Sequence, residues 1–196
     1  MWYNMRMKSM MRKVITVFTV LGMILVSLTG CSNVKEIDTA EERVIRYESF
    51  LSAIEANDSF VYTSNYFDME GIMNLNADGT YRYDVVIENP RIAMYDVQVL
   101  CVPRDATGTL QTKDLCPSAG ILEEASYNLV PNQINKDKGY PAGVIVSGVT
   151  KEDTVTLEVL VVWNGYARLA ENRQFLELTI KYTEPEPEPA ESGTGA

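Results

Sequence analysis

The chain has 196 residues, with 17 lysines and arginines against 27 aspartates and glutamates, and it contains no histidine. The lack of histidine excludes a Ser-His-Asp triad, a Cys-His dyad, a histidine-ligated metal site and a histidine general base. The first 30 residues hold four basic side chains and no acidic one, so the remaining 166 residues carry a net charge of −14. A body this acidic is a poor partner for nucleic acid, because the phosphates would repel it.

A basic segment and a short apolar run open the chain. Four basic residues between Arg6 and Lys13 precede an apolar run from Val14 to Leu28. The run fits the hydrophobic region of a signal peptide, about 7–15 residues, and is shorter than the about 20 residues of a membrane-spanning helix. We therefore expect residues 1–30 to be a signal peptide. The sequence does not specify which methionine starts the protein, since methionines also occur at positions 5, 7, 10 and 11.

The motif Leu28-Thr29-Gly30-Cys31 resembles the lipobox of bacterial lipoproteins. The resemblance implies cleavage between Gly30 and Cys31 and attachment of a diacylglyceryl group to the Cys31 sulfur. The protein would then lie outside the cytoplasm, anchored to a bacterial membrane, with residues 31–38 as a tether. The alternative is an ordinary signal peptide or a retained N-terminal anchor in which the cysteine is incidental.

A helix is predicted directly after this tether. Thr39 and Glu42 form a capping-box pattern, with a hydroxyl at the N-cap and a carboxylate three residues later. An apolar stripe at helical spacing follows, and the helix should end near residues 57–58. The stripe consists of Val44, Tyr47, Leu51 and Ile54. We expect it to pack on a core, and a partner-binding helix is the alternative.

Beyond residue 58 the apolar period changes from helical to strand-like. Four clear alternating runs cover residues 81–88, 95–102, 155–163 and 176–182, and weaker ones cover 60–67, 69–75, 125–130 and 143–149. Seven or eight short strands predict a mainly β fold, an antiparallel β-sandwich with one N-terminal helix. A helix followed by one curled antiparallel sheet is the alternative. Residues 39–182 would form this single domain, and the Glu/Pro-rich residues 183–196 an extended tail.

The segment from Leu75 to Tyr83 resembles a hairpin found in many secreted bacterial β-sandwich modules. The resemblance implies an immunoglobulin-like or related sandwich and carries no implication for a ligand. Asn74, Asn76 and Asp78 also match the start of an EF-hand-type calcium loop. The twelfth position of that loop is Val85 instead of glutamate, and a hairpin turn explains the same residues, so we predict no metal and no cofactor.

Cys101 and Cys116 are the cysteines that remain once Cys31 is lipidated. Because disulfides persist outside the cytoplasm, we expect a bond that pins the loop of Cys116 to the sheet. Two free thiols, one buried and one exposed, are the alternative. A catalytic cysteine is not expected, since no histidine could activate it.

Other candidate chemistry is weaker. The adjacent carboxylates Glu123-Glu124 and Glu152-Asp153 could supply the acid and base of a glycosidase, although neighbouring residues on a strand point to opposite faces. Tyr140 and Tyr166 could form an exposed platform for a ligand. Trp163 shares the apolar face of its alternating run with Val159 and Val161, so we expect it in the core.

These patterns favour a binding or scaffolding module for a protein or glycan partner at the cell envelope, with no catalysis. A carboxylate-dependent glycan hydrolase is one alternative. An inhibitor or immunity lipoprotein directed against a basic enzyme is another, because the acidic body suits a basic target.

Overall fold

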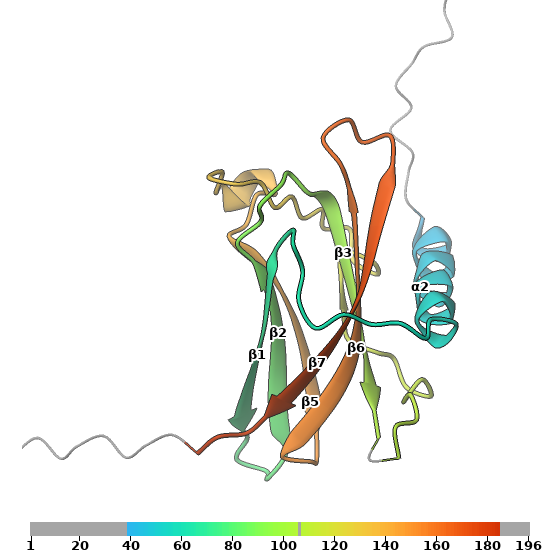
Figure 1. Cartoon of the computed structure of the whole chain (residues 1–196), viewed down its shortest axis with the longest axis vertical. Coiled ribbons are helices and arrows are strands. Elements are labelled where there is room, and N and C mark those ends of the chain that lie inside the picture. Colours follow the sequence, from blue (N-terminus) through green and yellow to red (C-terminus); the bar gives the residue numbers. More distant parts are fainter. Residues whose placement is uncertain (1–38, 106, 185–196) are drawn as a thin grey trace, which may run out of the picture. The chain divides into compact units, whose positions relative to one another are not determined.

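The computed structural model describes residues 39–105 and 107–184. The predicted signal peptide, the tether, the lipidation site Cys31 and residues 185–196 of the predicted tail lie outside these ranges. Within the described ranges the protein is mainly β, with two antiparallel sheets and one α-helix (Figure 1). That helix is too short and too polar to cross a bilayer, and the described ranges hold no other candidate.

Helix α2 (Ala40–Glu55) begins where its capping box predicts. The Thr39 hydroxyl accepts a hydrogen bond from the Glu42 amide, and the Glu42 carboxylate accepts one from the Thr39 amide. The buried stripe is Tyr47, Phe50 and Ile54, so the expected inclusion of Val44 is wrong. Arg43, one turn before Tyr47, lies nearer to the sheet, and its side chain pairs with Glu124. Val44, the next residue around the helix, is therefore turned toward solvent.

The smaller sheet has three strands in the order β1-β2-β5. They are β1 (Asp68–Leu75), β2 (Tyr81–Glu88) and β5 (Gly143–Thr150). A tight turn joins β1 to β2, in which Gly79 has a φ of +83° that side chains rarely adopt. The long connection from β2 to β5 contains two strands of the other sheet, β3 and β4. Strand β5 then returns to the smaller sheet and pairs with β2 on the side opposite β1.

The larger sheet has four strands in the order β4-β3-β6-β7. They are β3 (Tyr95–Arg104), β4 (Ser118–Ala119), β6 (Thr154–Asn164) and β7 (Glu171–Lys181). A bulge interrupts the pairing of β3 with β6 between Tyr95 and Gln98, and Asp96 there has a positive φ of 51°.

The main core lies between the two sheets, as the period-two patterns predict. The smaller sheet contributes Tyr83, Val85 and Ile87, and the larger one contributes alternate residues of β3 and β6. Gly71 on β1 lets this strand approach β7 closely, because a Cβ at that position would overlap the Ile180 side chain.

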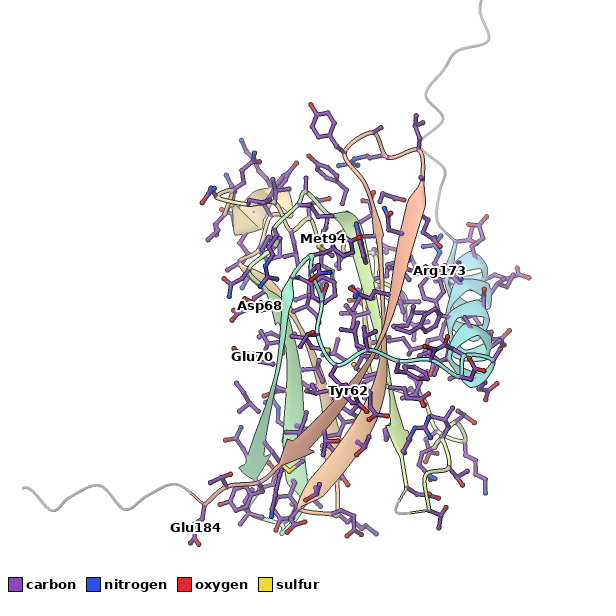
Figure 2. All side chains as sticks on the ribbon, viewed as in Figure 1. Tyr62, Asp68, Glu70, Met94, Arg173 and Glu184 are labelled. Carbon is purple, nitrogen blue, oxygen red and sulfur yellow. The ribbon has the colours of Figure 1, made fainter. Side chains whose placement is uncertain are left out.

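A second core lies on the other face of the larger sheet, beneath α2. Leu100, Val102, Leu160 and Val162 project from β3 and β6 toward Tyr47, Phe50 and Ile54 of the helix. The guanidinium of Arg173 on β7 also stacks over the Phe50 ring, 5.4 Å from its centroid (Figure 2). Fully burying a side chain such as Phe50 or Ile54 stabilises the fold by about 1.5–3 kcal/mol.

Two of the weaker strand predictions are wrong. Residues 60–67 make one parallel bridge, Val61 to Leu176, and residues 125–130 make isolated bridges at Leu129 and Val130. The two-residue strand β4 and the 3-10 helix Lys136–Lys138 were not predicted. Strand β4 depends on its pairing with β3, about 20 residues earlier, which a local pattern does not reveal.

Candidate functional site

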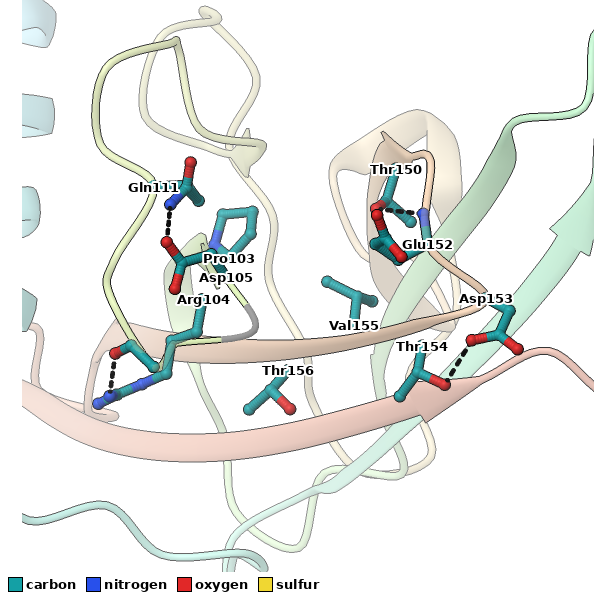
Figure 3. Close-up of a pocket in the computed structure, with 11 residues that line it drawn as sticks. Pro103, Arg104, Asp105, Gln111, Thr150, Glu152, Asp153, Thr154, Val155 and Thr156 are labelled. Atoms are coloured by element: carbon teal, nitrogen blue, oxygen red, sulfur yellow. Dashed lines mark hydrogen bonds between the residues drawn. The ribbon is translucent and has the colours of Figure 1, made fainter.

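A recess lies beside the free edge of β5 and forms a cleft there (Figure 3). Its floor is the start of β6, from Thr154 to Thr156, and the β5–β6 turn forms one wall. The other wall is the end of β3 with the loop that follows, from Pro103 to Gln111. The volume of this recess is about 850 Å3.

A second recess of about 440 Å3 adjoins the first. Both are lined by the same four residues where they meet, so they form one continuous depression, which we call the edge cleft. The shared residues are Pro103, Gln111, Thr150 and Val155. Leu115, Cys116 and the buried Tyr83 line the far end. The edge cleft therefore extends from the β5–β6 turn to the loop before β4.

Hydrogen bonds hold one wall of the edge cleft in shape. The Asp105 carboxylate accepts from the amides of Thr107 and Thr109, from the Thr107 hydroxyl and from the Gln111 side-chain amide. These bonds, chiefly the one from the Thr107 hydroxyl, lower the pKa of Asp105 below its ordinary value. Asp105 is thus an ionised carboxylate fixed to its own loop.

The opposite wall is held by short-range contacts. The Glu152 amide donates to the Thr150 hydroxyl at 3.2 Å, and the Thr154 hydroxyl donates to Asp153 at 3.0 Å (Figure 3). These bonds order the turn while the carboxylate of Glu152 stays at the surface.

Arg104 is the basic residue that lines the larger recess. Its guanidinium forms an ion pair with Glu158, a carboxylate that is fully buried under the loop, and donates to the Gly108 carbonyl at 2.8 Å. Because Glu158 already balances the Arg104 charge, Asp105, Glu152 and Asp153 make the recess electronegative.

The structure contradicts the predicted disulfide, since Cys101 and Cys116 are both free thiols. Strands β3 and β4 are antiparallel, with Leu100 opposite Ser118, and the Cys101 amide donates to the Pro117 carbonyl. Continuing this register by one residue places Cys116 opposite Val102 rather than Cys101. Successive residues alternate faces, which points Cys101 into the inter-sheet core and Cys116 toward the helix. Both thiols are buried, and burial raises their pKa values.

The structure does not bring the predicted tyrosine platform together. Tyr140 is partly buried and bridges to Asn135, whereas Tyr166 projects from the β6–β7 turn with 86% of its surface exposed. No ring contact joins the two tyrosines in the described part of the chain. The placement of Trp163 in the core is confirmed, since it is buried against Phe67.

Asn76 and Asp78 serve the β1–β2 turn. The Asp78 carboxylate accepts from the Thr80 amide and hydroxyl, and the Asn76 side chain donates to the same hydroxyl. Asn74 pairs with Arg82 across the hairpin. No cluster of three or more acidic or cysteine side chains suited to a metal occurs among residues 39–105 and 107–184.

Glu152 and Asp153, predicted as one of the carboxylate pairs, border the edge cleft, which the local sequence does not predict. The spacing Asp105-x-Thr107-x-Thr109 was a usable signal, because an aspartate followed by threonines at such intervals is typical of a side-chain-capped turn. Glu123 belongs to another region, where its carboxylate accepts from the Gly120 amide and the Tyr127 hydroxyl. Glu124 pairs with Arg43.

No protein-family model matches the chain, and no curated protein matches it. Among solved structures, it is similar to the X-ray structure of Northeast Structural Genomics Consortium target SoR45. The two share 11% sequence identity over 64% of this chain and 98% of the other, with a TM-score of 0.39. A likeness at this level carries no argument about function.

Proposed function

We propose that the protein is a lipid-anchored lipoprotein of a bacterial envelope. Its body would be an immunoglobulin-like β-sandwich that binds or scaffolds a protein or glycan partner without catalysis. The anchor is supported by the lipobox-like motif at Cys31, preceded by a basic segment and a 15-residue apolar run. Two acyl chains would hold the body at the membrane, since each buried methylene contributes about 0.8 kcal/mol.

The electronegative edge cleft is the observation that carries the binding role. Its larger recess presents Asp105, Glu152 and Asp153 around an arginine that Glu158 already neutralises. Asp114 adds a further carboxylate at the adjoining end. Carboxylates so placed attract a cationic segment during encounter and favour it over acidic competitors. Of the two partner classes, the cleft therefore favours a protein with a basic segment.

The free edge of β5 offers a second type of contact. In the three-stranded sheet β5 pairs with β2 on one side alone, and its residues Gly148, Val149 and Thr150 line the smaller recess. An extended segment lying in the cleft could hydrogen-bond to this edge, as in β-strand addition. Backbone bonds would supply affinity, and the carboxylates would select a basic sequence.

Glycan hydrolysis is less well supported. A glycosidase needs one carboxyl group whose pKa is raised so that it can act as the acid. The pKa of Asp105 is shifted in the opposite direction by the hydrogen bonds it accepts. The inhibitor or immunity role against a basic enzyme remains the second candidate, because the same electronegative cleft supports it.

Site-specific photo-cross-linking in intact cells tests the binding role. A photoreactive residue replaces Thr154 on the cleft floor, and a matched probe replaces Glu70, which is exposed on the outer face of β1 (Figure 2). We expect a discrete cross-linked partner at position 154 and not at position 70. Cross-linking should weaken in E152Q/D153N and at raised ionic strength, because salt screens exposed charges. Equal cross-linking at both positions, or none at position 154, would contradict the proposal.

A further inference from the structure

The tip of the β6–β7 hairpin exposes two large apolar side chains. Leu169 and Tyr166 have 90% and 86% of their surface exposed, the largest fractions of the large hydrophobic residues that the structure describes. The tip is a defined turn, since the Arg168 amide donates to the Gly165 carbonyl at 2.8 Å. Neither side chain contributes to a core, so the fold itself does not require them to be apolar.

The hairpin tip lies at the same end of the body as the start of α2 (Figure 1). Arg46 on α2 lines a small recess with Asn164 and Glu171, the paired residues at the base of the tip. One turn further along the helix, Phe50 lies under Arg173 of β7. Helix and strand therefore run in the same direction, and the first turns of α2 extend past Arg46 toward the tip. The helix from Ala40 to Arg46 is about 9 Å long, and it exposes Val44 and Ile45.

The distance from this end to the lipidation site is limited by the length of chain between them. Eight peptide units join Cys31 to Thr39, the N-cap of α2. Fully extended, they span at most about 26–29 Å. A lipid on Cys31 thus keeps the start of α2, and the hairpin tip beside it, close to the membrane surface.

The loop from Asn132 to Tyr140 reaches the same end. Asp96 connects this loop to the hairpin. Its carboxylate pairs with Arg168 of the hairpin at 3.6 Å. Its backbone amide donates to the side chain of Asn128, which in turn donates to the Gly139 carbonyl of the loop. This loop exposes Ile134 and carries Lys136 and Lys138. Asp137, Glu41 and Glu42 lie at this end too, so apolar contact rather than net charge would orient the body.

We infer that this end is a docking surface for the membrane that holds Cys31, with Leu169 and Tyr166 inserted among the lipid headgroups. The inference rests on the proposed lipid anchor. Leucine and tyrosine suit this layer, where an apolar side chain or ring body enters the acyl boundary and a phenol hydroxyl stays hydrated. The edge cleft lies at the other end of β6, ten residues or about 33 Å away. Docking at the tip therefore directs the cleft away from the membrane.

Depth-dependent fluorescence quenching tests the docking surface. The full chain is expressed in bacteria, purified in detergent and reconstituted into phosphatidylethanolamine–phosphatidylglycerol vesicles, with and without brominated acyl chains. L169W places a probe at the tip, and L75W is the matched control beside the β1–β2 turn at the opposite end, where Leu75 is also exposed. The unsubstituted protein supplies the background from Trp163, the native tryptophan that remains after cleavage before Cys31.

Bromines should quench the L169W signal by about half, as for a side chain about 5–10 Å deep in the headgroup boundary, and leave L75W unchanged. No quenching of L169W in protein that floats with the vesicles would overturn the docking surface and leave the anchor intact. Equal quenching of both probes would overturn the orientation. Protein that does not float with the vesicles would overturn the anchor and the inference together.

Discussion

The ion pair between Arg104 and Glu158 is the contact whose loss should weaken the body most clearly. Glu158 is fully buried on the helix-side face of β6, opposite Val102 and Glu177, and its partner in the structure is the Arg104 guanidinium. Arg104 also forms part of the edge cleft. The pair therefore links the stability of the larger sheet to the shape of the proposed binding surface.

Arg104→Ala would leave a carboxylate buried without its counterion. Removing one partner of a buried pair typically costs 3–5 kcal/mol, and because the Arg104 side chain is 31% exposed we expect about 3 kcal/mol. For a domain of this size, that loss lowers the melting temperature by roughly 6–12 °C. Replacing both charges with apolar groups, R104M/E158L, should recover most of the stability, because neither charge then needs compensation.

Urea denaturation at pH 7, followed by the fluorescence of the buried Trp163, measures these differences. R91A is a control, since the ion pair of Arg91 with Asp68 joins two solvent-exposed side chains and involves no core contact. A cost below about 1 kcal/mol for R104A, comparable to a surface ion pair, would refute this account of Glu158.

Three further predictions concern the core and its titratable groups. G71A should destabilise the protein by about 1–3 kcal/mol in urea denaturation because β1 packs against β7 there, whereas G165A, which has room for a Cβ, should not. Burial raises the pKa of Tyr47 to about 12, so the folded state retains its proton longer than the unfolded state. Stability should thus fall as the pH rises from about 10 to 12, and the urea midpoint of Y47F should fall less steeply, because Tyr83 and the two thiols, whose pKa values burial also raises, still contribute. Without reductant, Cys101 and Cys116 should both react with a thiol reagent in denaturant and neither should react rapidly in the folded protein; a disulfide-linked peptide pair would contradict this.

Local physical chemistry predicted much of the fold. The capping box at Thr39 and the alternation along β2, β3, β6 and β7 depend on neighbouring residues, and the structure confirms both. The stripe of α2 was misassigned because residues 43 and 44 both lie about one turn before Tyr47, and the local sequence does not show that Arg43 meets Glu124, 81 residues later. The register of β4 places Cys116 on the helix side, and no spacing in the sequence specifies that register.

The candidate site was harder to predict than the fold. The edge cleft joins the end of β3 to the β5–β6 turn, segments about 50 residues apart whose side chains have no shared motif. Its electronegative character also depends on Glu158, which a strand pattern presents as an ordinary outward-facing glutamate. Only the pairing of β3 with β6 brings that carboxylate beneath Arg104.

Lipid attachment at Cys31 is the central claim of the proposed function. Cells fed an alkyne-tagged fatty acid should label the wild-type protein, and it should fractionate with the membrane. C31A should lose the label and leave the membrane fraction, while C116A, which alters a thiol in the body, should keep both properties. Unlabelled wild-type protein, or C31A that remains in the membrane fraction, would contradict the account.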